Sequence, residues 1–295
     1  MKFKCNSCDG CYADSLDVRF TKACDNHCPF CIERQGICGK QIDVESMIDS
    51  TIKSGKKNVL ILGGEPLLEM EKVFRYIMGI RGYVDKIYLT TSLPYTIIEK
   101  WDLFEQIVLF LDGLNVSLQH YSSKINNEVL HASSNHDRIA LLQKMCENDM
   151  VSKKTRVSIN LVKGYIDSKL EIDRFLSMME MIGVRHVKIN ELQGSEDLYV
   201  SFEKSYGKRL PSPYSHGCQT EIELPNHNIR ITLKRSCFCV NNELTASIGD
   251  VVKAFIKMLL KQKKGALPKP HQMVVYENGL LSDGWMKLEE ENYVH

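Results

Sequence analysis

The sequence predicts an α/β fold in which helices cover a mostly parallel sheet. Six strand-like segments alternate with helical segments within about 190 of the 295 residues, and this alternation favours parallel strands joined by right-handed crossovers. The length suits one barrel-like domain with an appendage, or two domains. The sheet is expected to curve into a partial barrel or to form an open doubly wound sheet. In both, catalytic groups lie at the carboxyl ends of the strands.

The expected strands are short segments with strand-like alternation or continuous apolar runs. They span residues 17–22, 58–62, 86–91, 113–119, 156–162 and 185–191. Segments with apolar residues at helical spacing lie between them, at 43–54, 67–81, 96–106, 136–149 and 168–182. Asp43 is the expected N-cap of the first helix, and Gly55 is its stop signal.

Beyond about residue 195 the alternation ends, which predicts a small α+β appendage. It contains a strand-like segment at 228–233, a basic amphipathic helix at 250–264 and a hairpin at 273–285 that turns at Asn278-Gly279. We therefore expect a Cys-rich arm at 1–16, a core at 17–195 and a C-terminal extension at 196–295.

Composition excludes several classes of protein. Hydrophobic residues make up 43% and charged residues 25% of the chain, which argues against disorder, collagen-like repeats and coiled coils. The net charge of +1 gives no sequence-wide attraction for DNA or anionic lipid. The chain has no signal-peptide or membrane-spanning apolar run, so we expect a cytoplasmic protein without a DNA or membrane partner.

Cysteine is unusually frequent, with eleven residues in the chain. Six of them crowd into the first 31 residues: Cys5, Cys8, Cys11, Cys24, Cys28 and Cys31. Disulfides are disfavoured because the chain has no signal sequence and is large enough to build a core. The crowding therefore indicates metal or cluster ligation.

The second group, Cys24, Cys28 and Cys31, has the order C-x3-C-x2-C on the loop after the first expected strand. A cubane iron-sulfur cluster normally takes four thiolates. Three on one short loop therefore leave one iron open to a substrate or cofactor.

This spacing, with Phe30 before the third cysteine, resembles the radical S-adenosylmethionine (radical SAM) superfamily. The segment FTKACDNHCPFC especially resembles its MoaA-like, PqqE-like and viperin-like branches. A second match is Gly63-Gly64-Glu65-Pro66, which follows the second expected strand as the GGEP motif of the family does. The resemblance covers residues 17–195 and implies a partial (β/α)6 TIM-like barrel.

The resemblance also implies the chemistry. Cys24, Cys28 and Cys31 would hold a [4Fe-4S] cluster, and SAM would chelate the fourth iron. Reduction by a flavodoxin or ferredoxin would cleave SAM to methionine and a 5'-deoxyadenosyl radical, which abstracts hydrogen from the substrate. Oxygen sensitivity would follow from the low potential that this cleavage needs.

Further residues match the SAM pocket of the family. The GGEP segment would contact the methionine amino group, Phe30 the adenine and Ser117 the ribose. Asn160 matches a polar position on the fifth strand. Thr90 and Thr91 begin a stretch that relatives often continue with Asn-Gly, where this chain has Ser92 and Leu93. From its place at the end of the sixth strand, Glu191 is a candidate substrate contact.

The first cysteine group, Cys5, Cys8 and Cys11, has the spacing C-x2-C-x2-C. It favours a second metal centre, either another [4Fe-4S] cluster or zinc. The fourth ligand would come from the extension, from one of three further cysteines: Cys218, Cys237 and Cys239. The alternative is an N-terminal arm with reactive thiols.

The leading hypothesis for the substrate is a peptide or a small metabolite. A viperin-like nucleotide enzyme is the first alternative, with phosphate contacts from the basic helix. A glycyl-radical-enzyme activase and a non-catalytic iron-sulfur electron carrier or sensor are the others. The GGEP segment and Ser117 argue against a carrier, because a carrier needs no SAM pocket.

Overall fold

The computed structural model describes residues 15–31, 41–192, 195–208, 219–236, 273–283 and 285. The strands within these residues form one sheet, in the order β10-β9-β1-β2-β3-β4-β5-β6-β8-β7. Six neighbouring strands at its centre run parallel in chain order: β1 (Ser15–Thr21), β2 (Asn58–Gly63), β3 (Lys86–Thr91), β4 (Gly113–Ser117), β5 (Thr155–Leu161) and β6 (His186–Glu191). All six strands are those that the sequence predicts.

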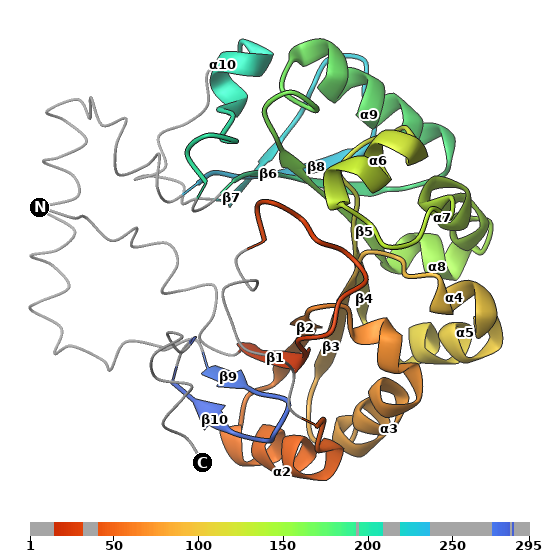
Figure 1. Ribbon diagram of the computed structural model, residues 1–295, viewed down its shortest axis with the longest axis vertical. Coiled ribbons are helices and arrows are strands. Elements are labelled where there is room, and N and C mark those ends of the chain that lie inside the picture. Colours follow the sequence, from red (N-terminus) through yellow and green to blue (C-terminus); the bar gives the residue numbers. More distant parts are fainter. Residues whose placement is uncertain are drawn as a thin grey trace, which may run out of the picture.

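Helices follow the strands and pack around the outside of the curved sheet (Figure 1). They are α2 (Val44–Ser54), α3 (Met70–Ile80), α4 (Thr96–Glu99), α5 (Trp101–Phe110), α6 (Ser123–Leu130), α7 (Arg138–Cys146), α8 (Asp149–Lys154), α9 (Lys169–Met181) and α10 (Phe202–Tyr206). A short 3-10 helix, η2 (Pro66–Glu69), precedes α3. Asp43 caps α2 as expected, because its side chain accepts a hydrogen bond from the Ser46 N–H.

Three helical expectations need correction. The single helix expected at 96–106 is divided into α4 and α5, because the backbone of Lys100 (φ −127°, ψ 46°) is not helical. The single helix expected at 136–149 is broken into α7 and α8, because the Asn148 side chain accepts a hydrogen bond from the Met150 N–H and caps a new helix. Helix α6 is not among the expected helices; four of the five residues of its first turn, SKINN, are polar or charged.

The hydrophobic core lies between the sheet and these helices. Alternate residues of the strands, such as Val18, Ile61 and Ile159, point to this side and are fully or almost fully buried. The residues between them face the inside of the curve, and many are polar, as in Arg19 and Ser158. The inside of the curved sheet is therefore lined by hydrogen-bonding groups. A polar ligand could bind to such a lining, whereas an apolar lining would offer it no hydrogen bonds.

Strands of the C-terminal extension continue the sheet at both edges. β8 (Arg230–Lys234) pairs parallel with β6, and β7 (Gln219–Ile222) pairs antiparallel with β8. At the other edge β9 (Met273–Val275) pairs parallel with β1, and β10 (Leu281–Ser282) pairs antiparallel with β9. These pairings join the described strands of the expected appendage to the core sheet.

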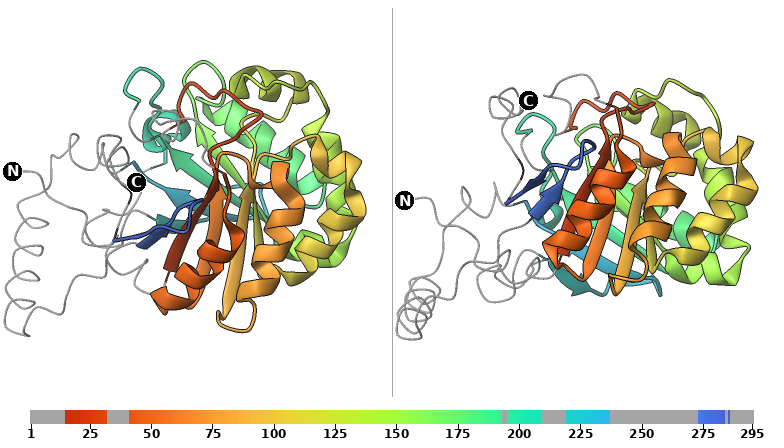
Figure 2. Two further views of the ribbon diagram at one scale, coloured as in Figure 1. Left: turned by 60° about the horizontal axis from the view of Figure 1, so that its bottom comes forward. Right: turned by 90° about the horizontal axis from the view of Figure 1, so that it is seen from below.

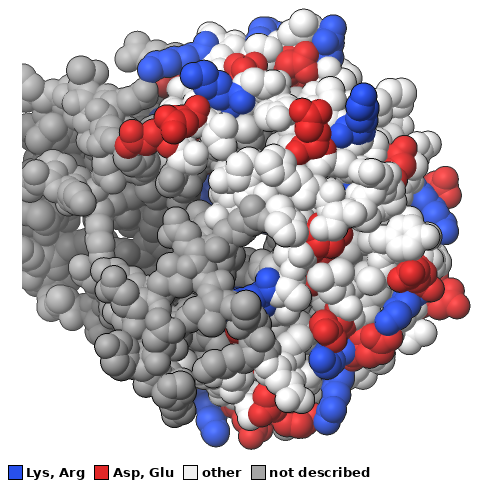
Figure 3. Space-filling view, viewed as in Figure 1, with Lys and Arg blue, Asp and Glu red and all other residues white. Residues whose placement is uncertain are grey.

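The hairpin expected to turn at Asn278-Gly279 is confirmed, and Gly279 adopts the positive φ (79°) that such a turn requires. The basic helix expected at 250–264 lies outside the described residues. Within the described parts of the chain, the helices are too short or too polar to cross a membrane. On the face of Figure 3, basic and acidic side chains alternate over the outer helices.

Candidate functional site

The cysteine loop, residues 22–31, leaves the carboxyl end of β1 and arches over that end of the sheet (Figure 2). Its three cysteines, Cys24, Cys28 and Cys31, are free thiols. The Cys31 N–H donates to the Cys28 carbonyl (3.2 Å), and the Asn26 N–H donates to the Cys24 Sγ (3.4 Å). These bonds make a compact turn that holds the three thiols on one short segment.

A cavity of about 1020 Å³ lies beneath this loop at the carboxyl ends of the strands. It is lined by most residues that the sequence analysis singled out: Cys24, Cys28, Phe30, Cys31, Gly63, Gly64, Glu65, Thr91, Ser117, Asn160 and Glu191. Pro66 does not line it; it is buried at the start of η2. Residues from seven strands and the loops that follow several of them thus meet at one cavity. Their individual roles toward a ligand stay predictions.

Two glycines let β2 and the cysteine loop approach each other closely. A Cβ atom on Gly63, whose φ is +135°, would lie 2.4 Å from the Thr21 carbonyl oxygen, and one on Gly64 would lie 2.2 Å from that of Ala23. The Gly64 N–H donates to Thr21 O, and the Glu65 N–H donates to Ala23 O, both at 2.7 Å. Any side chain at position 63 or 64 would push the loop away.

Glu65 is buried, with 1% of its surface exposed. Its Oε1 accepts hydrogen bonds from the Leu67 N–H and the Thr91 hydroxyl, and its Oε2 accepts two from Ser92. Burial raises the pKa of this carboxyl to about 7, although the four hydrogen bonds favour its ionised form. The carboxylate therefore holds the end of β3 and the start of η2 together.

Glu191 lines the cavity, but its carboxylate binds protein. One oxygen accepts from the Phe202 N–H (2.9 Å) and the other from the Ser236 N–H (3.0 Å). Burial raises the pKa of this side chain. Glu191 thereby ties α10 and the segment after β8 to the end of β6, which is an anchoring role that the sequence analysis did not foresee.

The far wall of the cavity is polar and mostly uncharged. Gln119 Oε1 accepts from the Asn160 N–H (3.1 Å), and Asn190 Nδ2 donates to the Ser158 hydroxyl (2.9 Å). Lys234, the last residue of β8 and the register partner of Asn190, adds a positive charge to this wall. Sequence reasoning missed Lys234 because nothing local in NIRITLK shows that this strand joins β6.

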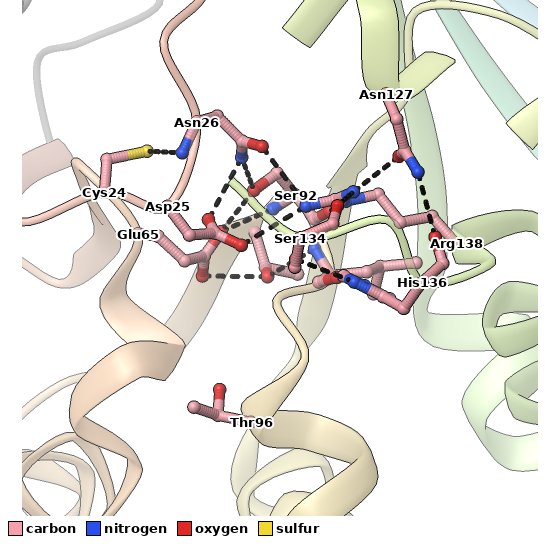
Figure 4. Close-up of polar contacts among 12 residues, drawn as sticks. Cys24, Asp25, Asn26, Glu65, Ser92, Thr96, Asn127, Ser134, His136 and Arg138 are labelled. Atoms are coloured by element: carbon pink, nitrogen blue, oxygen red, sulfur yellow. Dashed lines mark hydrogen bonds and ion pairs between the residues drawn. The ribbon is translucent and has the colours of Figure 1, made fainter. Parts of the chain in front are cut away.

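The network behind the cysteine loop was also missed. Figure 4 shows Arg138, Ser92 and Asn26 linking this loop to the end of β3. One signal in the sequence pointed to Arg138: Leu141, Leu142 and Met145 follow it at three, four and seven positions, so it lies on the apolar face of the helix.

The residues assigned to a second metal centre lie outside the described part of the chain: Cys5, Cys8, Cys11, Cys218, Cys237 and Cys239. Within the described part, no three His, Cys, Asp or Glu side chains converge on one metal ion. Cys24, Cys28 and Cys31 need not converge on one metal ion to hold a cubane cluster, because each thiolate of such a cluster binds a separate iron. Their spacing on one loop therefore fits a cluster.

A curved parallel sheet with a three-cysteine loop over its carboxyl end defines a class of enzyme. Residues 18–177 match the model of the Radical SAM superfamily, and the chain belongs to that superfamily. The family implies a [4Fe-4S] cluster and SAM. Both the expected partial barrel and the expected enzyme class are confirmed.

The chain is similar to several characterised proteins. It is 24% identical to GTP 3',8-cyclase of Lactiplantibacillus plantarum, over 92% of each protein. The structure is similar to that of Streptococcus suis SuiB, with a TM-score of 0.55 and 17% identity, covering 92% of this chain and 60% of SuiB. A radical SAM methyltransferase from Sphaerobacter thermophilus gives a TM-score of 0.51 at 14% identity, covering 72% and 63%. The chain thus spans about three fifths of the length of SuiB.

Proposed function

We propose that this enzyme binds its [4Fe-4S] cluster through Cys24, Cys28 and Cys31, cleaves SAM, and abstracts hydrogen from a peptide or small-molecule substrate in the cavity below. The observation that supports this most is the shared cavity, which the cysteine loop and the GGEP segment line from adjacent strands. When bound, the cluster and SAM would supply the 5'-deoxyadenosyl radical. The protein supplies orientation and exclusion of water.

The residues divide this work between two sides of the cavity. On the loop side, three thiolates would leave one iron open to SAM, and the close approach at Gly63 and Gly64 holds the GGEP segment beside the cysteine loop. On the far side, Ser158, Asn190 and Lys234 offer hydrogen bonds and a positive charge. The cavity lies at the upper end of the size range of small-molecule sites, so it would suit SAM together with part of a polar substrate.

A nucleotide is the second candidate substrate. It is favoured by the similarity to a GTP 3',8-cyclase over 92% of both chains. A peptide remains the first candidate together with other small metabolites, since SuiB has been solved with a bound precursor peptide. A non-catalytic carrier or sensor is disfavoured, because it would need no cavity beside its cluster.

The test is the release of 5'-deoxyadenosine. The full chain is reconstituted with iron and sulfide without oxygen, reduced by dithionite or by a flavodoxin or ferredoxin, and given SAM. The wild type is expected to release 5'-deoxyadenosine, and Cys28→Ala is expected to release none. Cys146→Ser is the matched control, since Cys146 lies on α7 outside the cavity. Equal release by Cys28→Ala and the control would rule the assignment out.

The substrate is then tested with GTP deuterated in its ribose. Deuterium in the released 5'-deoxyadenosine would support the nucleotide. If the product is unlabelled and its amount does not increase when GTP is added, a peptide or a small metabolite remains as the candidate substrate.

We also propose that Cys5, Cys8 and Cys11 hold a second metal centre with Cys218, Cys237 or Cys239. Two cubane clusters would give about eight irons per chain, whereas about four irons with one zinc would make it a zinc site.

A further inference from the structure

Arg138 is the largest fully buried side chain in the described parts of the chain, with none of its surface exposed. It is the first residue of α7, yet its guanidinium reaches back to the cysteine loop (Figure 4). Its hydrogen-bond acceptors come from three separate segments: Asp25 Oδ2 (3.2 Å), Asn26 Oδ1 (3.2 Å), Ser92 O (2.9 Å), Asn127 Oδ1 (2.5 Å) and Ser134 O (3.5 Å).

Two of these acceptors lie between prospective cluster ligands. Asp25 and Asn26 are two of the three residues between Cys24 and Cys28, and both accept from the same nitrogen, Nη2. Asn26 also donates from Nδ2 to the Ser92 hydroxyl (2.7 Å), and its N–H donates to the Cys24 Sγ (3.4 Å). One guanidinium thus fixes the segment that sets the separation of the first two thiols.

Burial of this cation is costly unless it is paired and fully hydrogen-bonded. Asp25 is its only anionic partner at ion-pair distance among the described residues, and the side chain of Asp25 is 15% exposed. Apolar packing alone would favour leucine or methionine here, as at Leu141 and Met145 on the same face of α7. Packing therefore does not explain why a charged residue, Arg138, stands at this buried position.

We propose that Arg138 is the positioning residue of the cysteine loop, and that its buried positive charge stabilises the reduced form of the cluster bound there. The inference rests on the proposed assignment of Cys24, Cys28 and Cys31 as cluster ligands. Reduction adds one negative charge to a cluster that three thiolates already surround. A permanent cation in a poorly solvated region beside it favours the reduced form, since cluster potentials depend on net charge, hydrogen bonding and solvent exposure.

Arginine suits this task better than lysine. The guanidinium has five N–H donors in a fixed plane and stays protonated in proteins. A lysine at 138 would retain the charge but would lose the fork that reaches Asp25 and Asn26 together. Arg138→Lys therefore keeps the charge and changes the geometry, whereas Arg138→Met removes both.

The experiment compares Arg138→Met, Arg138→Lys and the control Arg75→Met in the full chain. Arg75 lies on the outer face of α3 in an exposed ion pair with Glu45. Two quantities are measured: amide hydrogen exchange of residues 22–31 in the metal-free protein, and the midpoint potential of the reconstituted cluster by electron paramagnetic resonance.

For Arg138→Met we expect exchange in residues 22–31 to be faster by about tenfold or more and the midpoint potential to become more negative. For Arg138→Lys we expect faster loop exchange with a potential close to that of the wild type. Arg75→Met should change neither. If Arg138→Met folds and leaves both quantities unchanged, the proposal is overturned.

If Arg138→Met does not fold, Arg138→Lys decides. Faster exchange confined to residues 22–31 supports the proposal, whereas exchange that is unchanged, or raised equally throughout α6 and α7, overturns it. A failure of the proposed function is distinguishable, because the wild type itself would then bind no cluster. The hydrogen exchange of the metal-free loop can be measured in either case.

Discussion

Ser92 binds Glu65 twice, since its N–H and its hydroxyl both donate to Glu65 Oε2, at 2.6 and 2.7 Å. The same hydroxyl accepts from Asn26 of the cysteine loop. Position 92 is one of the two at which this chain departs from the Thr-Thr-Asn-Gly stretch that the family resemblance implies. Ser92 therefore has a structural role at this position, because it connects the GGEP segment to the loop that carries the cysteines.

Ser92→Ala should lower the stability of the metal-free protein. The substitution removes the hydroxyl that donates to a buried carboxylate and leaves the Asn26 amide without that acceptor, a loss worth about 1–3 kcal/mol in the free energy of unfolding. Urea unfolding measures it. Ser46→Ala is the control, because the Ser46 hydroxyl donates to Asp43 at an exposed position, and its effect should stay within about 0.5 kcal/mol. Equal effects of the two substitutions would contradict the linking role of Ser92.

Gly64→Ala should displace the cysteine loop. The added methyl group would lie 2.2 Å from the Ala23 carbonyl oxygen and 2.7 Å from that of Lys22, so backbone must move, at a cost of about 2 kcal/mol or more. We expect lower stability in urea and fewer irons bound after reconstitution. Gly82→Ala is the matched control, since a Cβ there meets nothing within 4 Å. Full iron loading by Gly64→Ala would show that the close approach is dispensable.

The contrast between Gly64 and Arg138 explains what the sequence could predict. The cysteine loop and the glycine pair were found because each is a short motif whose chemistry depends on local spacing. The network around Arg138 joins residues that are 46 and 113 positions apart in the chain, and no local pattern gives that distance. Its only trace is a charge on an apolar helical face, which indicates a buried ion but not its partner.

The edges of the sheet were unpredictable for the same reason. β9 follows more than 200 residues after β1 in the chain, and a three-residue strand in a hairpin gives no sign that it also pairs parallel with the first strand. Leu93 is a different case. It adopts a φ of 60° and is fully buried, so tertiary packing overrides the preference for glycine in this left-handed conformation.

Arg19 and Glu277 should behave as a coupled pair. They form an ion pair of 3.0 Å with side chains only 6% and 4% exposed, and Arg19 also lies 4.2 Å from the centre of the Tyr276 ring. Arg19→Met would leave a buried carboxylate unpaired and should cost about 3–5 kcal/mol. The double substitution Arg19→Met/Glu277→Met should cost less than the sum of the two single ones.

A double-mutant cycle in urea measures this coupling. The control cycle uses Arg75 and Glu45, whose side chains are 66% and 64% exposed, and should give a coupling below about 1 kcal/mol. Additive effects for Arg19 and Glu277 would mean that the pair does not hold the segment after β9 to β1.

His186 should make the stability of the protein depend on pH. It lies on β6 with its Nε2 2.8 Å from the Thr232 hydroxyl of β8. Burial lowers its pKa to about 4, and the positive charges of Arg156 and Arg230 add to this effect while Glu221 opposes it.

The folded protein therefore holds the neutral imidazole of His186, whereas the unfolded chain takes up a proton below about pH 6.5. The contribution of His186 is present above pH 6.5 and is lost as the pH falls toward 4. His186→Gln has no such titration, so in urea unfolding the stability of the wild type relative to the variant should stay constant from pH 7.5 to about pH 6.5 and should fall from there to pH 4.5. A difference that stays constant over this range would mean that His186 is protonated as readily in the folded protein as in the unfolded chain.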